Sequence, residues 1–87
     1  MVWNVEFSKR AKKDATLIVG VHLGKQLRSL FDVLERNPFQ NPPPYEKLGG
    51  SLKGRYSRRI NQQHRLVYEV DKVRKTVFIV RMWSHYE

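Results

Sequence analysis

The chain has 87 residues, of which 40% are hydrophobic and 29% charged, so we expect one small globular domain over residues 1–87. It contains no cysteine, which excludes disulfides, a cysteine-based zinc site and thiol catalysis, and its three scattered histidines lack metal-ligand spacing. Its 17 Lys and Arg against 8 Asp and Glu give a net charge of +9, which favours a polyanionic partner such as nucleic acid.

The basic excess lies mainly in the second half of the chain. Residues 45–87 carry 10 basic and 4 acidic side chains, an excess of +6, whereas residues 1–44 carry 7 and 4. No apolar run approaches the roughly 18 residues that a membrane-spanning helix needs, and the first ten residues lack the features of a secretory signal. We therefore expect a cytoplasmic protein that does not enter a membrane.

The first half predicts a strand followed by two helices. Residues 2–7 are rich in β-formers, and Ser8 is a suitable N-cap for a helix beginning at Lys9. The core-facing positions of the two helices recur at helical spacing, namely Ala11, Ala15 and Ile18 in the first and Leu27, Leu30, Phe31 and Leu34 in the second. The second helix should end at Asn37, because the residue before a proline is driven out of the helical region.

Residues 37–51 are rich in proline and glycine and predict a long loop, and three strands are expected after it, over residues 53–60, 64–70 and 76–83. The strand over 76–83 is almost continuously apolar, so we expect it to be central and covered on both faces. The predicted fold is α+β, with the order β-α-α-β-β-β. Two N-terminal helices pack on one face of a mainly antiparallel four-stranded sheet.

Alternation places Arg59 and Arg65 on the same face of neighbouring strands, opposite the apolar residues. Two guanidinium groups held side by side suit a phosphate, to which each can donate two charge-assisted hydrogen bonds. Glu46 in the preceding loop can accept a proton, and His85 near the C-terminus can donate one near neutral pH. These four side chains fit RNA cleavage by the adjacent 2′-hydroxyl, with Glu46 as base, the arginines as clamp and His85 as acid, and with no metal or cofactor.

The segment SRRINQQHRLVYEV, residues 57–70, resembles the Txe/YoeB family of toxins within the RelE/ParE superfamily. The resemblance extends to YEKL at 45–48, LKGRY at 52–56, Asn37-Pro38-Phe39 and the terminal Ser84-His85-Tyr86, and is specific from about residue 37 onward. The first 24 residues depart from the family pattern, because this stretch is basic and aliphatic rather than acidic and aromatic.

The resemblance implies a RelE/ParE-like fold and a ribosome-dependent messenger-RNA interferase that cuts the codon in the ribosomal A site. It places the general base at Glu46, the phosphate-binding arginines at Arg59 and Arg65, and the acid with its aromatic partner at His85 and Tyr86. It also implies a cognate antitoxin that covers the site, contact with messenger RNA and the ribosome, and a possible homodimer. We further expect five cations to contact RNA: Lys47, Lys53, Arg55, Arg58 and Arg81.

Three other interpretations stay open on the sequence alone. The protein could be a non-catalytic basic module that docks on RNA or the ribosome, for which the Glu46 and His85 pair would be superfluous. It could be a gyrase-poisoning toxin of the same superfamily, which would not need that pair either. A binder of anionic membranes is weaker, because the basic residues lie on predicted strands and loops rather than on one sharply amphipathic helix.

Overall fold

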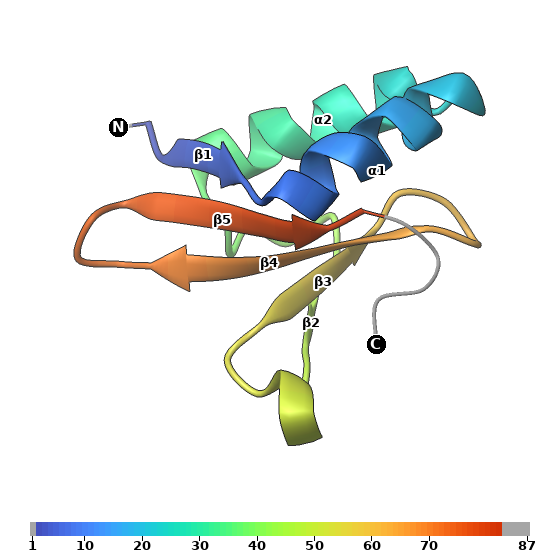
Figure 1. Ribbon diagram of the computed structural model, residues 1–87. Coiled ribbons are helices and arrows are strands. Elements are labelled where there is room, and N and C mark those ends of the chain that lie inside the picture. Colours follow the sequence, from blue (N-terminus) through green and yellow to red (C-terminus); the bar gives the residue numbers. More distant parts are fainter. Residues whose placement is uncertain (1, 83–87) are drawn as a thin grey trace.

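The computed structural model describes residues 2–82 of the chain. Two long helices lie together on one side of a sheet, and a short 3-10 turn lies at the opposite end of the molecule (Figure 1). The elements follow one another as β1 (Asn4–Phe7), α1 (Lys9–Gly20), α2 (Gly24–Arg36), β2 (Glu46–Lys47), η1 (Gly50–Leu52), β3 (Tyr56–Arg59), β4 (Arg65–Asp71) and β5 (Thr76–Arg81). The α+β layout and both helices are confirmed.

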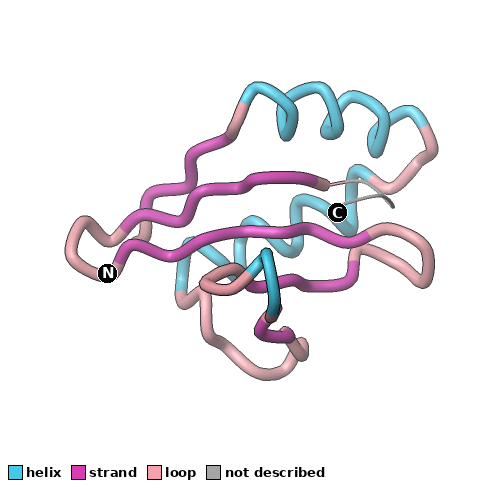
Figure 2. Tube along the Cα trace, turned by 60° about the horizontal axis from the view of Figure 1, so that its bottom comes forward, coloured by secondary structure: helices cyan, strands magenta, loops and turns pink. Residues whose placement is uncertain are grey.

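Within residues 2–82 the sheet has five strands in the order β1-β5-β4-β3-β2. β1 runs parallel to β5, and the other three pairs are antiparallel, so the sheet is mainly antiparallel as expected. The strands lie side by side across the view of Figure 2. The fifth strand is β2, whose two residues lie inside the segment predicted to be only a loop. The expected count of four strands is therefore wrong by this one short strand.

The core lies between the helices and one face of the sheet. Most of its buried residues come from α1, α2, β4 and β5, and the largest of them include Ile18, Leu34, Leu66, Tyr68 and Ile79. Phe7 of β1 and Phe31 of α2 add an edge-to-face contact with ring centroids 5.3 Å apart. Because the helices cover this face, the polar residues that alternate with the core residues in β3 and β4 point to the opposite face.

The expectation that the strand over residues 76–83 is covered on both faces is wrong for its described part. Val77 and Ile79 are fully buried toward the helices, but Phe78 between them is 36% exposed. The strand is apolar because β5 lies between β1 and β4 and packs under α1. Trp83 lies outside the described residues. No helix in residues 2–82 is long and apolar enough to cross a membrane.

Candidate active site on the face opposite the helices

Three neighbouring strands bring Glu46, Ser57 and Arg65 together on the sheet face that points away from the helices. Glu46 of β2 pairs in register with Ser57 of β3, and Arg65 begins β4. The Arg65 Nη2 atom lies 2.7 Å from Glu46 Oε1, and Nη1 donates to Ser57 Oγ at 2.9 Å. The Arg65 side chain is 18% exposed and the Glu46 side chain 62%. The predicted base and one predicted clamp residue are thus in direct contact, with the carboxylate open to solvent.

Arg59 is the direct cross-strand neighbour of Arg65, because the two residues are paired in the β3–β4 ladder. The side chain of Arg59 is exposed, and it forms no ion pair within residues 2–82. The turn between the two strands is held by Asn61, whose Oδ1 accepts the amide protons of Gln63 and His64. The hairpin therefore presents two guanidinium groups on one face, one held by Glu46 and one available to an anion.

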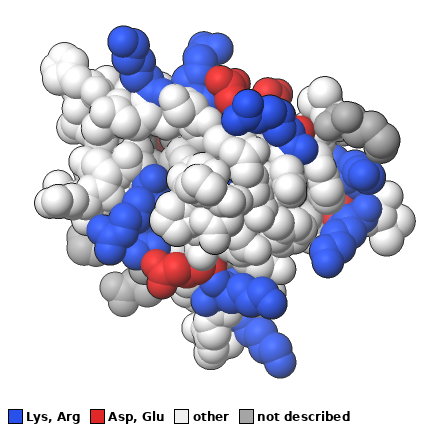
Figure 3. Space-filling model, turned by 180° about the vertical axis from the view of Figure 1, so that it is seen from behind, with Lys and Arg blue, Asp and Glu red and all other residues white. Residues whose placement is uncertain are grey.

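Lys47, Lys53 and Arg55, which we expect to contact RNA, line one surface hollow of about 440 Å³ beside β2. Both lysines are exposed, whereas Arg55 donates from Nε to Glu69 at 2.9 Å and is half-buried. The view from behind Figure 1 shows Lys and Arg side chains around the rim of a largely uncharged centre (Figure 3). The hollow lies at the β2 edge of the sheet, and because successive strand residues face opposite sides, the Lys47 side chain lies with Tyr56 on the face opposite Glu46.

Arg58 is the clearest correction to the sequence-based assignment, since it is only 1% exposed and cannot present its charge to RNA at the surface. Its guanidinium donates to the carbonyls of Pro38 at 2.9 Å, Gln40 at 2.9 Å and Pro43 at 2.7 Å. Its Nε also donates to the Tyr68 hydroxyl at 3.2 Å, and that hydroxyl donates to Pro38 at 2.8 Å. Burial raises the pKa of Tyr68 to about 12. Arg58 binds the proline-rich loop instead.

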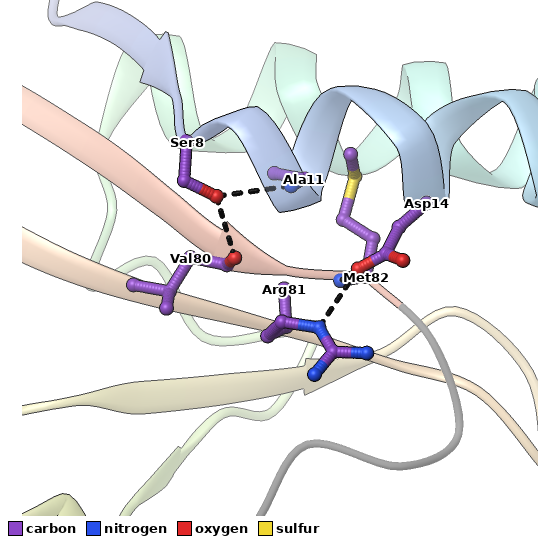
Figure 4. Close-up of polar contacts among 6 residues, drawn as sticks. All are labelled: Ser8, Ala11, Asp14, Val80, Arg81 and Met82. Carbon is purple, nitrogen blue, oxygen red and sulfur yellow. Dashed lines mark hydrogen bonds and ion pairs between the residues drawn. The ribbon is translucent and has the colours of Figure 1, made fainter.

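Arg81, the last of the predicted RNA-binding residues, is turned toward α1. Its Nε donates to Asp14 Oδ2 at 3.0 Å, and the same oxygen accepts the backbone N–H of Met82 at 3.1 Å (Figure 4). Beside this pair, Ser8 caps α1 by accepting the Ala11 N–H and donates its own hydroxyl proton to the Val80 carbonyl at 2.8 Å. These contacts fasten the beginning of α1 to the end of β5, and they offset the charge that Arg81 would offer to RNA.

His85 and Tyr86, the predicted acid and its aromatic partner, lie outside the described residues. Ser57, Asp14 and Tyr68 were not predicted from the sequence as residues of the site or of its support. Alternation in β3 could have predicted Ser57, because it puts this residue on the same face as Arg59. Asp14 and Tyr68 could not be predicted in this way, because their partners are distant in sequence. Within residues 2–82 no group of three or more His, Cys, Asp or Glu side chains is arranged to hold a metal ion.

Comparison with known proteins shows the family of the chain. Residues 7–86 match the family model described as YoeB-like toxin of bacterial type II toxin-antitoxin system. This chain belongs to that family. Toxin YoeB of Synechocystis sp. (strain ATCC 27184 / PCC 6803 / Kazusa) is 35% identical over 63 residues, which cover 72% of this chain and 71% of that protein. The YoeB-like match includes most of the first 24 residues, despite their unusual composition.

Solved structures of YoeB toxins share the fold. YoeB from Staphylococcus aureus, in a heterotetrameric YoeB–YefM complex, has a TM-score of 0.80 and 34% identity over 99% of this chain and 100% of its own. A YoeB/ParE toxin from Agrobacterium tumefaciens has a TM-score of 0.84, covering 95% of this chain and 99% of its own, at 24% identity. The second likeness supports the fold alone.

Proposed function

We propose that this YoeB-like toxin is an endoribonuclease that cuts messenger RNA in the ribosomal A site without a metal ion or cofactor. Glu46 takes the proton of the 2′-hydroxyl, whose oxygen attacks the adjacent phosphorus. The bond from phosphorus to the 5′ oxygen breaks, and the protonated His85 imidazole donates its own proton to that leaving oxygen, while Tyr86 supports the acid. The products are a 2′,3′-cyclic phosphate and a 5′-hydroxyl.

The single observation that carries the proposal is the contact between Glu46 and Arg65 next to Arg59. A base and two cations beside each other match the needs of a pentavalent phosphorus, which gains negative charge as the 2′ oxygen attacks. Arg65 is partly buried and already oriented by Ser57, so it loses little freedom when a phosphate binds. Glu46 remains largely exposed, as a base that must reach a substrate hydroxyl requires.

The partners follow from the relatives. YoeB of Staphylococcus aureus is found in complexes with YefM and as a dimer, and Escherichia coli YafQ is found in a complex with DinJ. We propose that a cognate antitoxin likewise covers the site of this chain and that the toxin forms a homodimer. A toxin that acts on translating ribosomes works in the cytoplasm, and no part of the proposed mechanism needs a membrane.

A cleavage assay on translating ribosomes tests the proposed function. Purified toxin should cut ribosome-bound messenger RNA within the A-site codon, as mapped by primer extension, and leave cyclic-phosphate ends. A messenger with one 2′-deoxynucleotide at the cut position is the matched control and should stay intact there, because it lacks the nucleophile. Cleavage of the deoxy substrate would exclude this chemistry. Arg65→Ala should slow the cleavage step by about 10²–10³-fold, as the loss of an oxyanion-stabilising donor does.

Growth experiments separate the rival functions. His85→Gln should abolish growth arrest while the protein still binds ribosomes, whereas a non-catalytic module would arrest growth unchanged. Expression of the wild-type toxin should deplete messenger RNA without a DNA-damage response. Induction of that response with intact messenger RNA would favour gyrase poisoning instead.

A further inference from the structure

Arg58 holds three separate points of one loop. Its guanidinium binds the carbonyls of Pro38, Gln40 and Pro43, which lie along the segment between α2 and β2. Tyr68 of β4 adds a second attachment, since its hydroxyl donates to Pro38. The loop is thereby tied to β3 and β4, two strands of the sheet that carries the site.

The same loop leads directly into Glu46. Tyr45, the residue before Glu46, lies against the Arg58 guanidinium with its ring centroid 5.0 Å from Cζ. Its ring also packs on Tyr56 at 5.9 Å and on Phe39 at 6.0 Å. β2 itself has only two residues, Glu46 and Lys47, so its ladder offers few hydrogen bonds to fix its place. The position of the Glu46 backbone therefore depends on the anchored loop.

Burying a hydrophobic side chain in the place of Arg58 would cost less desolvation free energy than burying a guanidinium. Within residues 2–82, Arg58 forms no ion pair with a carboxylate, and the groups around its guanidinium are neutral carbonyls, a phenol and a ring. Removing a cation from water without an anion to pair with is costly. What the guanidinium provides is geometry, because its rigid planar fork can donate to several carbonyls at fixed angles at the same time.

We propose that Arg58 is a positioning residue, which sets the place of the Glu46 carboxylate against Arg65 by fixing the loop over residues 38–45. The expected effect on cleavage rests on the proposed function, whereas the effect of Arg58 on the placement of β2 does not. Arg58 touches no reacting group; it acts through the loop and through Tyr45.

The test compares Arg58→Lys and Arg58→Met with wild type in two measurements. Hydrogen exchange of the Leu48 amide, which donates to the Arg55 carbonyl at 2.9 Å next to β2, reports the placement of that strand. Single-turnover cleavage at saturating toxin reports the chemical step, and a titration reports RNA affinity. Both variants should exchange Leu48 at least tenfold faster and cleave at least tenfold more slowly, with RNA affinity within twofold of wild type. Lysine should not rescue, because it keeps the charge and loses the fork.

Leu30→Ala in α2 is the control for a general loss of stability, since Leu30 is a buried core residue of the helix layer. It should leave the cleavage rate and Leu48 exchange near wild-type values at temperatures below unfolding. Tyr68→Phe removes only the attachment of the loop at Pro38. It should speed Leu48 exchange and slow cleavage several-fold rather than tenfold. This variant keeps the test decisive if the Arg58 variants do not fold.

Wild-type Leu48 protection and cleavage in Arg58→Lys would overturn the proposal, as would equal losses in Leu30→Ala. If wild-type toxin cuts no RNA, the proposed function fails, yet the exchange data still decide whether Arg58 fixes β2.

Discussion

Arg58 and Arg59 are neighbours in β3 and face opposite sides of the sheet. Arg59 is exposed beside Arg65, and Arg58 is buried under the loop. Alternation along β3 puts Arg58 on the same face as Tyr56 and Ile60, and in the structure it is buried there. Its charge suggested RNA binding, and that assignment was wrong. No local pattern could predict the hydrogen-bond partners of Arg58. They are three carbonyls of a distant loop, and without them a buried guanidinium would not be tolerated.

Tyr68 allows a test of this buried network through pH. Burial raises its pKa to about 12 from 10.0, so above pH 10 the unfolded chain loses the phenolic proton before the folded protein does. The stabilisation is complete below pH 10 and declines as pH rises toward 12. Relative to Tyr68→Phe, wild type should lose on the order of 1 kcal/mol of unfolding free energy by about pH 11. Urea unfolding of both proteins between pH 8 and about pH 11 measures the difference, and a constant gap between them would contradict it.

At the scale of elements, the helices were predictable and β2 was not. The Ser8 cap and the proline after Asn37 are local signals, and α1 begins at Lys9 and α2 ends at Arg36, where those two signals place them. β2 has two residues in a proline-rich segment, and it exists only because it pairs with β3 ten residues later. The contact of Glu46 with Arg65 depends on that pairing. The roles of the two residues could be predicted from the sequence, but their contact could not.

The Ser8 hydroxyl has two hydrogen-bond partners at the junction between α1 and β5. Ser8→Ala removes the cap on Ala11 and the hydrogen bond to Val80, so it should lower the free energy of unfolding by about 1–2 kcal/mol. Thr16→Ala is the matched control, because it removes an exposed hydroxyl from the same helix and should change stability by less than about 0.5 kcal/mol. Chemical denaturation measures both. Equal effects would show that the cap contributes nothing specific.

At the scale of the whole molecule, a net charge of +9 on 87 residues attracts RNA to any face, so the site must add local contacts to this general attraction. The cations are divided between the β2 edge of the sheet and the helix layer. Lys47 and Lys53 lie beside Glu46, whereas α1 begins with Lys9, Arg10, Lys12 and Lys13 and has no acidic residue in its first turn. The total charge therefore does not show which surface binds RNA, but substitutions of individual cations can show it.

The salt dependence of RNA binding gives that location. Each phosphate contact to single-stranded RNA contributes about −0.7 to the slope of log K against log salt concentration. Lys47→Gln and Lys53→Gln should each make the slope shallower by roughly that amount, because each removes one counterion-releasing contact. Lys25→Gln is the control, since Lys25 is also exposed but lies in α2 on the helix side of the sheet. Fluorescence titrations at several salt concentrations measure the slopes. If Lys25→Gln changes the slope as much as Lys47→Gln, RNA is held by diffuse charge and not by the edge of the sheet that carries β2.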